Sequence, residues 1–176
     1  MNQINSVALL LLTFLMASFT FIQQEVELEV QAVLDGRMEM LLPKSFKAFS
    51  EDEVEEGATA NVVFENESQT ISLALNYATA QVTQENIPAF QEGFVGSVKA
   101  GYNISEWKKD EIIEVDGHKI GLMEFTAKDG EVESYFMMFY TDVAGRLLIT
   151  TFNSPREDME EWAPLANKMV NSIKML

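Results

Sequence analysis

Residues 132–140, VESYFMMFY, decide the fold of this chain, because they carry apolar side chains on both faces of one expected strand. Successive side chains of an extended chain point to opposite faces, so Phe136 lies on one face and Phe139 on the other. The next strand, RLLITTFN at residues 146–153, repeats this pattern. Strands with two apolar faces are buried on both sides, so the sequence predicts a central sheet that is covered above and below.

The segments around this strand predict antiparallel neighbours. Short turns, such as Asp116-Gly117, separate the last four strands, which are expected at residues 105–115, 118–127, 132–141 and 146–153. Alternating apolar residues predict two earlier hairpins, at residues 26–34 with 37–42 and at residues 61–65 with 70–78. On the first of these strands we expect Val30 and its alternate neighbours to face the core.

Two segments have the apolar period of a helix instead. Residues 83–102 are expected to begin at an N-cap, Asn86, and to end at Gly101. Their apolar stripe consists of Ile87, Phe90, Phe94 and Val98. The second helix follows a capping box formed by Ser154 and Glu157. One helix on each face would cover the sheet. The alternatives are both helices on one face, or one helix that leaves an aromatic and methionine-rich groove open.

Composition predicts one acidic globular domain. The chain has 176 residues, of which 47% are hydrophobic and 23% are charged, so it can bury a sizeable core. Its formal net charge is −16 without a basic stripe, and neither nucleic acid nor an anionic membrane surface is an expected partner. Because there are no cysteines, a disulfide framework, a thiol nucleophile and a cysteine-based zinc site are excluded.

An apolar run at residues 7–22, VALLLLTFLMASFTFI, precedes the first charged side chain, Glu25. The run is short for a bilayer span, which needs about 20 residues, and suits the hydrophobic part of a signal peptide. We therefore expect residues 1–23 to be a signal peptide and residues 24–176 to be a single exported domain, periplasmic or extracellular. The alternative is an uncleaved leader that anchors the domain to the membrane through residues 7–22.

Few residues offer chemistry. His118 is the only histidine, and no Gly-x-Ser-x-Gly motif supplies a nucleophile, so we interpret it as a solvated turn residue. The acidic run at residues 51–56, EDEVEE, lacks the spacing and the glycine of a calcium loop. We interpret it as a solvated loop, with weak cation binding as the alternative. The sequence thus predicts no catalytic residue, no cofactor and no metal.

Two segments carry a resemblance to a known fold group: DGRMEMLLPKSF at residues 35–46, and the ending, in which the strand LLITTF at residues 147–152 leads into a helix that finishes with NSIKML at residues 171–176. With the helix between them, the chain resembles the Mog1/PsbP-like fold group and, within it, the DUF1795/DcrB-like bacterial proteins. The resemblance implies an α+β fold, an antiparallel β-sheet sandwiched by helices. It implies no catalytic motif, since members serve as binding or assembly factors, among them a Ran-binding protein, a photosystem subunit and chaperones of secreted effectors.

These observations favour an exported, non-enzymatic binding or assembly module. Its partner is expected to be a protein or an envelope component, bound through a sheet face or a groove between helix and sheet. An exposed aromatic cluster would provide the contact, and the candidates are Trp107, Tyr135 and Phe139. The alternative is a carboxylate-based hydrolase of the cell envelope, which needs two acidic side chains in one concave site.

Overall fold

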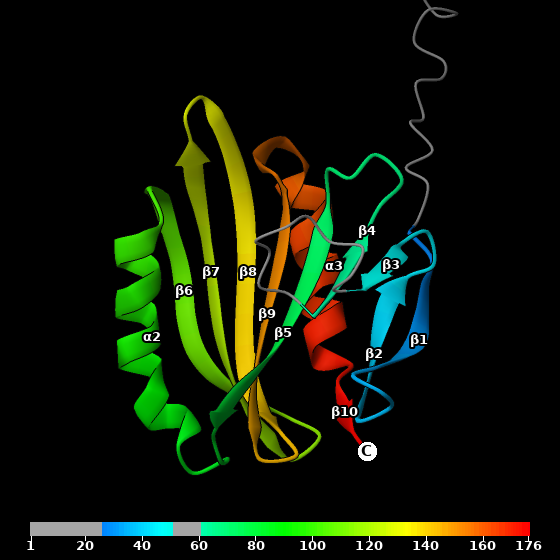
Figure 1. Cartoon of the computed structure of the whole chain (residues 1–176). Helices are drawn as coiled ribbons and strands as arrows, with labels where there is room; N and C mark the ends of the chain where they lie inside the picture. Colours follow the sequence, from blue (N-terminus) through cyan, green and yellow to red (C-terminus); the bar gives the residue numbers. More distant parts are fainter. Residues whose placement is uncertain (1–25, 51–60) are drawn as a thin grey trace, which may run out of the picture.

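The computed structural model describes residues 26–50 and 61–176, so the predicted leader and the acidic run at residues 51–56 lie outside the described residues. The described residues form two antiparallel sheets and two α-helices (Figure 1). The strands are β1 (Leu28–Val33), β2 (Met38–Pro43), β3 (Lys47–Ser50), β4 (Val62–Glu65), β5 (Ser72–Gln81), β6 (Ile104–Val115), β7 (His118–Asp129), β8 (Val132–Val143), β9 (Arg146–Pro155) and β10 (Lys174–Met175). The helices are α2 (Ile87–Gly101) and α3 (Met159–Asn171), and a 3-10 turn, η1 (Arg156–Asp158), precedes α3. None of the described helices has the length and apolar character that a bilayer crossing demands.

The predicted meander forms one half of a seven-stranded sheet. The strand order is β3-β4-β5-β9-β8-β7-β6, and every neighbouring pair is antiparallel. Tight turns join β6 to β7 and β8 to β9, and their residues Asp116, Gly117, Ala144 and Gly145 all have positive φ. A smaller sheet of order β1-β2-β10 lies beside it, at the right of Figure 1.

The two faces of β8 enter two separate cores, which confirms the prediction from residues 132–140. Phe139 lies in the larger core with Trp162 of α3, whereas Phe136 packs against the smaller core, which contains Val98 of α2. Helix α3 contacts β8 and β9, and α2 contacts β6 and β7. One helix therefore lies on each face of the sheet, the expected α+β arrangement, and the alternative with both helices on one face is wrong.

The first hairpin forms as predicted, but Val30 in the middle of its first strand is exposed. The register places Gln31 opposite Met40 and Val30 opposite Leu41. Met40 is fully buried, while Val30 is 63% exposed, so the expectation that Val30 faces the core is wrong. The two faces of a strand cannot both face one core. Burial of the larger side chains of β2, such as Met40, removes more apolar surface from water than burial of Val30 would, so the face that carries Val30 is left exposed.

Helix α3 begins later than the sequence predicts. β9 continues through Pro155 because Ser154 pairs with Tyr135 of β8. The 3-10 turn follows, and the residue at the N-cap of α3 is Asp158. The predicted capping box of Ser154 and Glu157 is therefore wrong, since strand pairing occupies the residue that would cap the helix.

The sequence does not predict two short strands at the sheet edges. β3 has four residues and pairs with β4, and β10 has two residues and pairs with β2. Segments this short are not distinguished by an alternating pattern, which needs about four to eight residues to be recognised. Only the tertiary arrangement brings each of them beside a partner strand.

Candidate functional site

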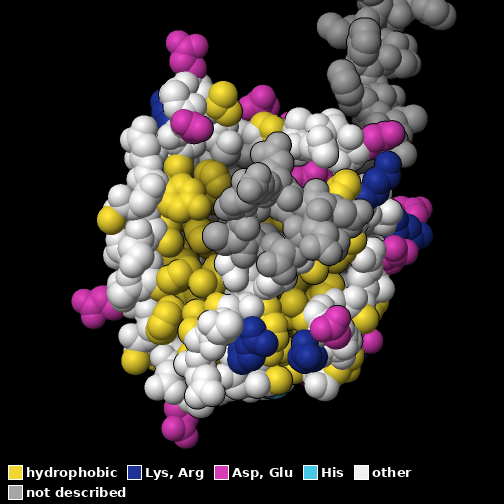
Figure 2. All heavy atoms as spheres, in the orientation of Figure 1, with side chains coloured by type: hydrophobic (Ala, Val, Ile, Leu, Met, Phe, Trp, Pro, Cys, Tyr) yellow, Lys and Arg dark blue, Asp and Glu magenta, His cyan; other side chains and the backbone are white. Residues whose placement is uncertain are grey.

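The face of the large sheet that carries α2 is only partly covered by that helix. α2 packs against β6 and β7, which form one end of the sheet. Hydrophobic side chains therefore remain visible as a yellow band between α2 and the middle of the sheet in Figure 2. This is the incomplete cover that the sequence allowed as an alternative, and it makes this face the candidate site.

Aromatic rings form a ladder across three strands of this face. The register places Trp107 of β6 opposite Phe125 of β7, and Phe125 opposite Phe136 of β8. The rings stack nearly parallel, with centroids 5.4 Å apart in the first pair and 5.2 Å apart in the second. Tyr102, which caps the end of α2, lies edge-on to both phenylalanines at 5.3 Å. We call Tyr102, Trp107, Phe125 and Phe136 the aromatic patch.

The aromatic patch is closely packed around Phe125, and its edges reach solvent. Phe125 is fully buried, Trp107 and Phe136 are half-buried, and Tyr102 is 36% exposed. Partial burial raises the pKa of the Tyr102 hydroxyl. The indole N–H of Trp107 donates to the Asp110 carboxylate at 2.7 Å, and the Lys99 ammonium lies 4.1 Å from the centre of the Trp107 ring. Aromatic side chains that are held in place by packing and expose one edge to solvent are typical anchor residues of protein interfaces.

A second aromatic group holds the start of α2 on the sheet. The rings of Phe90 and Phe94 lie 5.8 and 5.0 Å from the ring of Tyr140, which is fully buried. Burial, with the negative charge of Asp110 as a smaller cause, raises the pKa of Tyr140 to about 12. Gly121 of β7 stands opposite Tyr140, and a Cβ there would overlap the phenol ring. Glycine at this position lets the ring lie across β7 and meet the helix, while Phe90 stays 40% exposed.

A hollow of about 690 Å³ opens beside Phe90, between the start of α2 and the turn that joins β8 to β9. The charged residue in its wall is Arg146. Its guanidinium donates to the carbonyl oxygens of Tyr77 at 3.1 Å and Ala78 at 3.0 Å, and its carbon atom Cζ lies 4.0 Å from the centre of the Tyr77 ring. Basic side chains are visible at the foot of this face in Figure 2.

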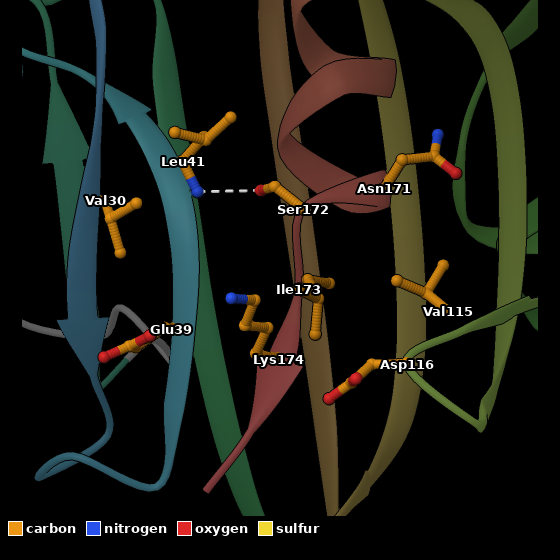
Figure 3. Close-up of a pocket in the computed structure, with 9 residues that line it drawn as sticks. All are labelled: Val30, Glu39, Leu41, Val115, Asp116, Asn171, Ser172, Ile173 and Lys174. Atoms are coloured by element: carbon orange, nitrogen blue, oxygen red, sulfur yellow. Dashed lines mark hydrogen bonds between the residues drawn. The ribbon is translucent and has the colours of Figure 1, made fainter.

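Another hollow, of about 390 Å³, lies between the small sheet, the end of α3 and the turn that joins β6 to β7 (Figure 3). Glu39, Asp116 and Lys174 stand in its wall, but several of its polar groups already join parts of the fold. Asp116 accepts a hydrogen bond from the backbone N–H of Met175 at 3.2 Å, and the Ser172 hydroxyl accepts one from the backbone N–H of Leu41 at 2.7 Å. We interpret this hollow as the joint that attaches β10 and the end of α3 to β2.

The structure separates the three predicted partner-binding residues. Trp107 belongs to the aromatic patch, but Tyr135 and Phe139 lie on the opposite face of the sheet, 0% and 1% exposed beneath α3. The expectation that Tyr135 and Phe139 form an exposed cluster is therefore wrong, because alternation along β8 places them on the face that α3 closes. A role for Trp107 in binding stays a prediction.

The structure also places the candidate catalytic and metal-binding residues of the sequence analysis. His118 is half-buried at the start of β7, where its Nδ1 lies 3.0 Å from the carbonyl oxygen of Asp116. In the part of the chain that the structure describes, no three acidic or histidine side chains converge as metal ligands would. The sequence reasoning missed Tyr102, Phe136 and Arg146. The turn signal Asp129-Gly130 would have placed Phe125 opposite Ser134, so only the observed register shows that Phe136 stands opposite Phe125.

Comparison with known proteins identifies the fold but offers no close relative. The sequence matches no protein-family model, and no curated protein matches it significantly. The solution structure of cyanobacterial PsbP (CyanoP) from Synechocystis is similar with a TM-score of 0.62 at 14% identity, covering 92% of this chain and 99% of that one. The Saccharomyces cerevisiae Ran-binding protein Mog1p gives a TM-score of 0.55 at 12% identity, covering 85% and 96%.

A third similar structure is LpqN of Mycobacterium tuberculosis, described as involved in cell envelope biogenesis, with a TM-score of 0.52 at 8% identity. The match covers 86% of this chain and 91% of LpqN. Sequence identities this low speak for a shared fold alone. The two antiparallel sheets, the helix on each face and these three matches together show that the chain has the Mog1/PsbP-like fold.

Proposed function

We propose that this protein is an exported, non-enzymatic binding module that docks a partner protein of the cell envelope on its aromatic patch. The observation that carries the proposal is the solvent-reaching edge of the patch: Trp107, Phe136 and Tyr102 are held in fixed positions around the buried Phe125 but are not closed over by α2. A rigid aromatic surface loses little side-chain entropy when a partner covers it, so burial of its edge contributes directly to binding.

Two of the similar proteins support the proposal, one as a binding protein and the other through its part in the cell envelope. Mog1p is a Ran-binding protein, and LpqN is involved in cell envelope biogenesis. The expected signal peptide at residues 1–23 supports export of this chain. A net charge of −16 favours a partner whose contact surface is basic around an apolar centre, because opposite charges accelerate association.

The test is affinity capture from a native envelope extract with the wild-type chain and with Trp107→Ala. We expect the substitution to remove a captured protein, because truncation of a central aromatic anchor typically costs about 2–4 kcal/mol of binding free energy. Val30→Ala is the matched control, since Val30 is exposed and apolar but lies on the small sheet. Circular dichroism and thermal unfolding would establish that both variants are folded.

Trp107→Phe gives a second, milder variant. Phenylalanine keeps a ring above Phe125 but removes the N–H that donates to Asp110, so capture should be weakened and not lost. If wild type, Trp107→Ala and Val30→Ala capture the same proteins in equal amounts, the aromatic patch is not the docking surface.

A further inference from the structure

We propose that the free edge of β6, over residues 109–115, accepts an added antiparallel strand from a partner segment that carries basic and apolar side chains. β6 is the last strand of the seven-stranded sheet, at the left end of the sheet in Figure 1. This edge is distinct from the sheet face that carries the aromatic patch, and the inference does not depend on docking at that patch.

The backbone of residues 109–115 has unpaired hydrogen-bonding groups on one side. The stretch pairs with residues 118–124 of β7, and no other strand of the described residues lies beside it. Within the described part of the chain, no backbone hydrogen bond joins it to a helix, turn or loop either. Along an antiparallel edge strand every second residue turns its N–H and C=O groups outward, so the stretch presents a row of unused donors and acceptors.

Only the second half of β6 has the regular geometry that strand addition requires. The register with β7 shifts twice before Lys109 and is unbroken from Lys109 to Val115. Bulges and lysine side chains are devices by which proteins protect a sheet edge from pairing. The first half contains both register shifts and Lys108, whereas residues 110–115 contain no register shift, no lysine and no proline. The edge is therefore protected at one end and open at the other.

The side chains along this edge favour a basic and apolar strand. Asp110, Glu111 and Glu114 are exposed, and Ile112 between them is 36% exposed. The one cation of the stretch is Lys109, whose ammonium already lies 3.2 Å from the Glu111 carboxylate. Because opposite charges in directly opposed cross-strand pairs are stabilising, lysine or arginine is favoured opposite the carboxylates and an apolar side chain opposite Ile112.

A second copy of this chain does not fit the same edge. Antiparallel pairing of two copies over the whole of residues 109–115 would place Asp110 of each copy opposite Glu114 of the other. Like charges directly opposed on neighbouring strands are destabilising, and each chain has a net charge of −16. The acidic side chains therefore oppose self-association through this edge and leave it accessible to a partner of opposite charge.

A synthetic peptide built as the complement of residues 109–115 tests the proposal. The sequence Val-Lys-Val-Val-Lys-Lys-Glu, with both ends blocked, places lysine opposite the three carboxylates, valine opposite the apolar residues and glutamate opposite Lys109 in antiparallel register. We expect saturable one-to-one binding to the purified protein in isothermal titration calorimetry. In hydrogen-exchange NMR, the newly protected amides should lie at alternate positions of residues 109–115, because only every second N–H points away from β7.

Two control peptides separate strand addition from simple charge attraction. Val-Lys-Pro-Pro-Lys-Lys-Glu keeps every charge but cannot form the ladder hydrogen bonds at its centre, and Val-Glu-Val-Val-Glu-Glu-Lys keeps the apolar pattern with reversed charges. Neither control should bind. The proposal is overturned if the complementary peptide does not bind, if the proline peptide binds equally well, or if the protected amides lie outside β6.

Charge reversal on the protein tests the same contact from the other side. Glu114→Lys should weaken binding of the complementary peptide about five- to tenfold, because an exposed ion pair becomes a like-charge pair. Glu92→Lys is the matched control, since Glu92 is exposed on α2 and the net charge changes equally, and it should alter binding by less than about twofold. Thermal unfolding would establish that both variants are folded. Equal weakening by the two substitutions would show that net charge alone attracts the peptide, which contradicts a site on β6.

Discussion

Gly121 has no side chain, and the Tyr140 ring that packs against α2 occupies the space that a side chain would fill. Gly121→Ala therefore tests directly how α2 packs on the sheet. Gly121 and Tyr140 are directly opposed on β7 and β8, and a Cβ on Gly121 would occupy the space of the phenol ring. Tyr140 is fully buried, and its hydroxyl donates to Gln91 of α2, so the ring has no free space into which to turn. The substitution must either displace the ring or push the two strands apart.

The expected loss in the free energy of unfolding of Gly121→Ala follows from these contacts. Overpacking a well-packed core costs about 1–3 kcal/mol. Displacement of the ring also breaks the hydroxyl hydrogen bond, at about 1 kcal/mol, while the lower backbone entropy of unfolded alanine returns about 0.4–1 kcal/mol. We expect a net destabilisation of about 2–3 kcal/mol, which lowers the melting temperature by about 5–10 °C in a chain of this length.

A double-mutant cycle, measured by urea unfolding, tests the cause. Tyr140→Ala alone should cost about 3–5 kcal/mol, because it leaves a cavity beneath α2. In that background Gly121→Ala should be neutral or slightly stabilising, which gives a coupling free energy of about 2–3 kcal/mol. Gly93→Ala is the control, since no atom lies within 4 Å of a Cβ at this exposed helical position, and it should stabilise by about 0.5–1 kcal/mol. The reasoning fails if Gly121→Ala costs the same with and without the Tyr140 ring.

Two further predictions concern buried tyrosines. The hydroxyl of Tyr135 is buried and makes no hydrogen bond of normal geometry among the described residues, although the nearby Glu124 carboxylate helps burial to raise its pKa. Tyr135→Phe should therefore stabilise the protein by about 1 kcal/mol in urea unfolding, and a loss of stability would show that the hydroxyl donates to Glu124 instead. The pKa of Tyr140 is raised to about 12, so the fold favours its neutral form. Its contribution is fully present below about pH 10 and lost as the pH rises toward 12, which amounts to about 1.4 kcal/mol at pH 11. Tyr140→Phe should therefore lose less stability than the wild type between pH 9 and pH 11, and equal losses would show that Tyr140 does not titrate as described.

Much of the fold was predictable because its signals are local. The two apolar faces of residues 132–140, the turn residues between strands and the helical period of α2 each depend on neighbours in the sequence. They led to an antiparallel sheet with one helix on each face, and the structure confirms this arrangement. The register of β7 with β8 does not follow from the sequence, because an Asp129-Gly130 turn would place Phe125 opposite Ser134. The structure instead pairs Asp129 with Val132, and thereby Phe125 with Phe136.

What the sequence could not provide is the choice between equivalent faces. Alternation shows that Tyr135 and Phe136 point to opposite sides, but it does not say which side a helix closes more fully. The same limit explains the misassigned face of β1, where burial of Met40 exposes Val30.

The candidate sites were decided in the tertiary structure for a related reason. The partial cover by α2 and the anchoring of Arg146 on the irregular part of β5 arise from contacts between segments far apart in the chain. The sequence by itself determined the elements and their antiparallel order, because those depend on periodicity and turn chemistry. Only tertiary packing decided which aromatic rings are buried and which reach solvent, because the exposure of a side chain depends on which distant segments pack against it.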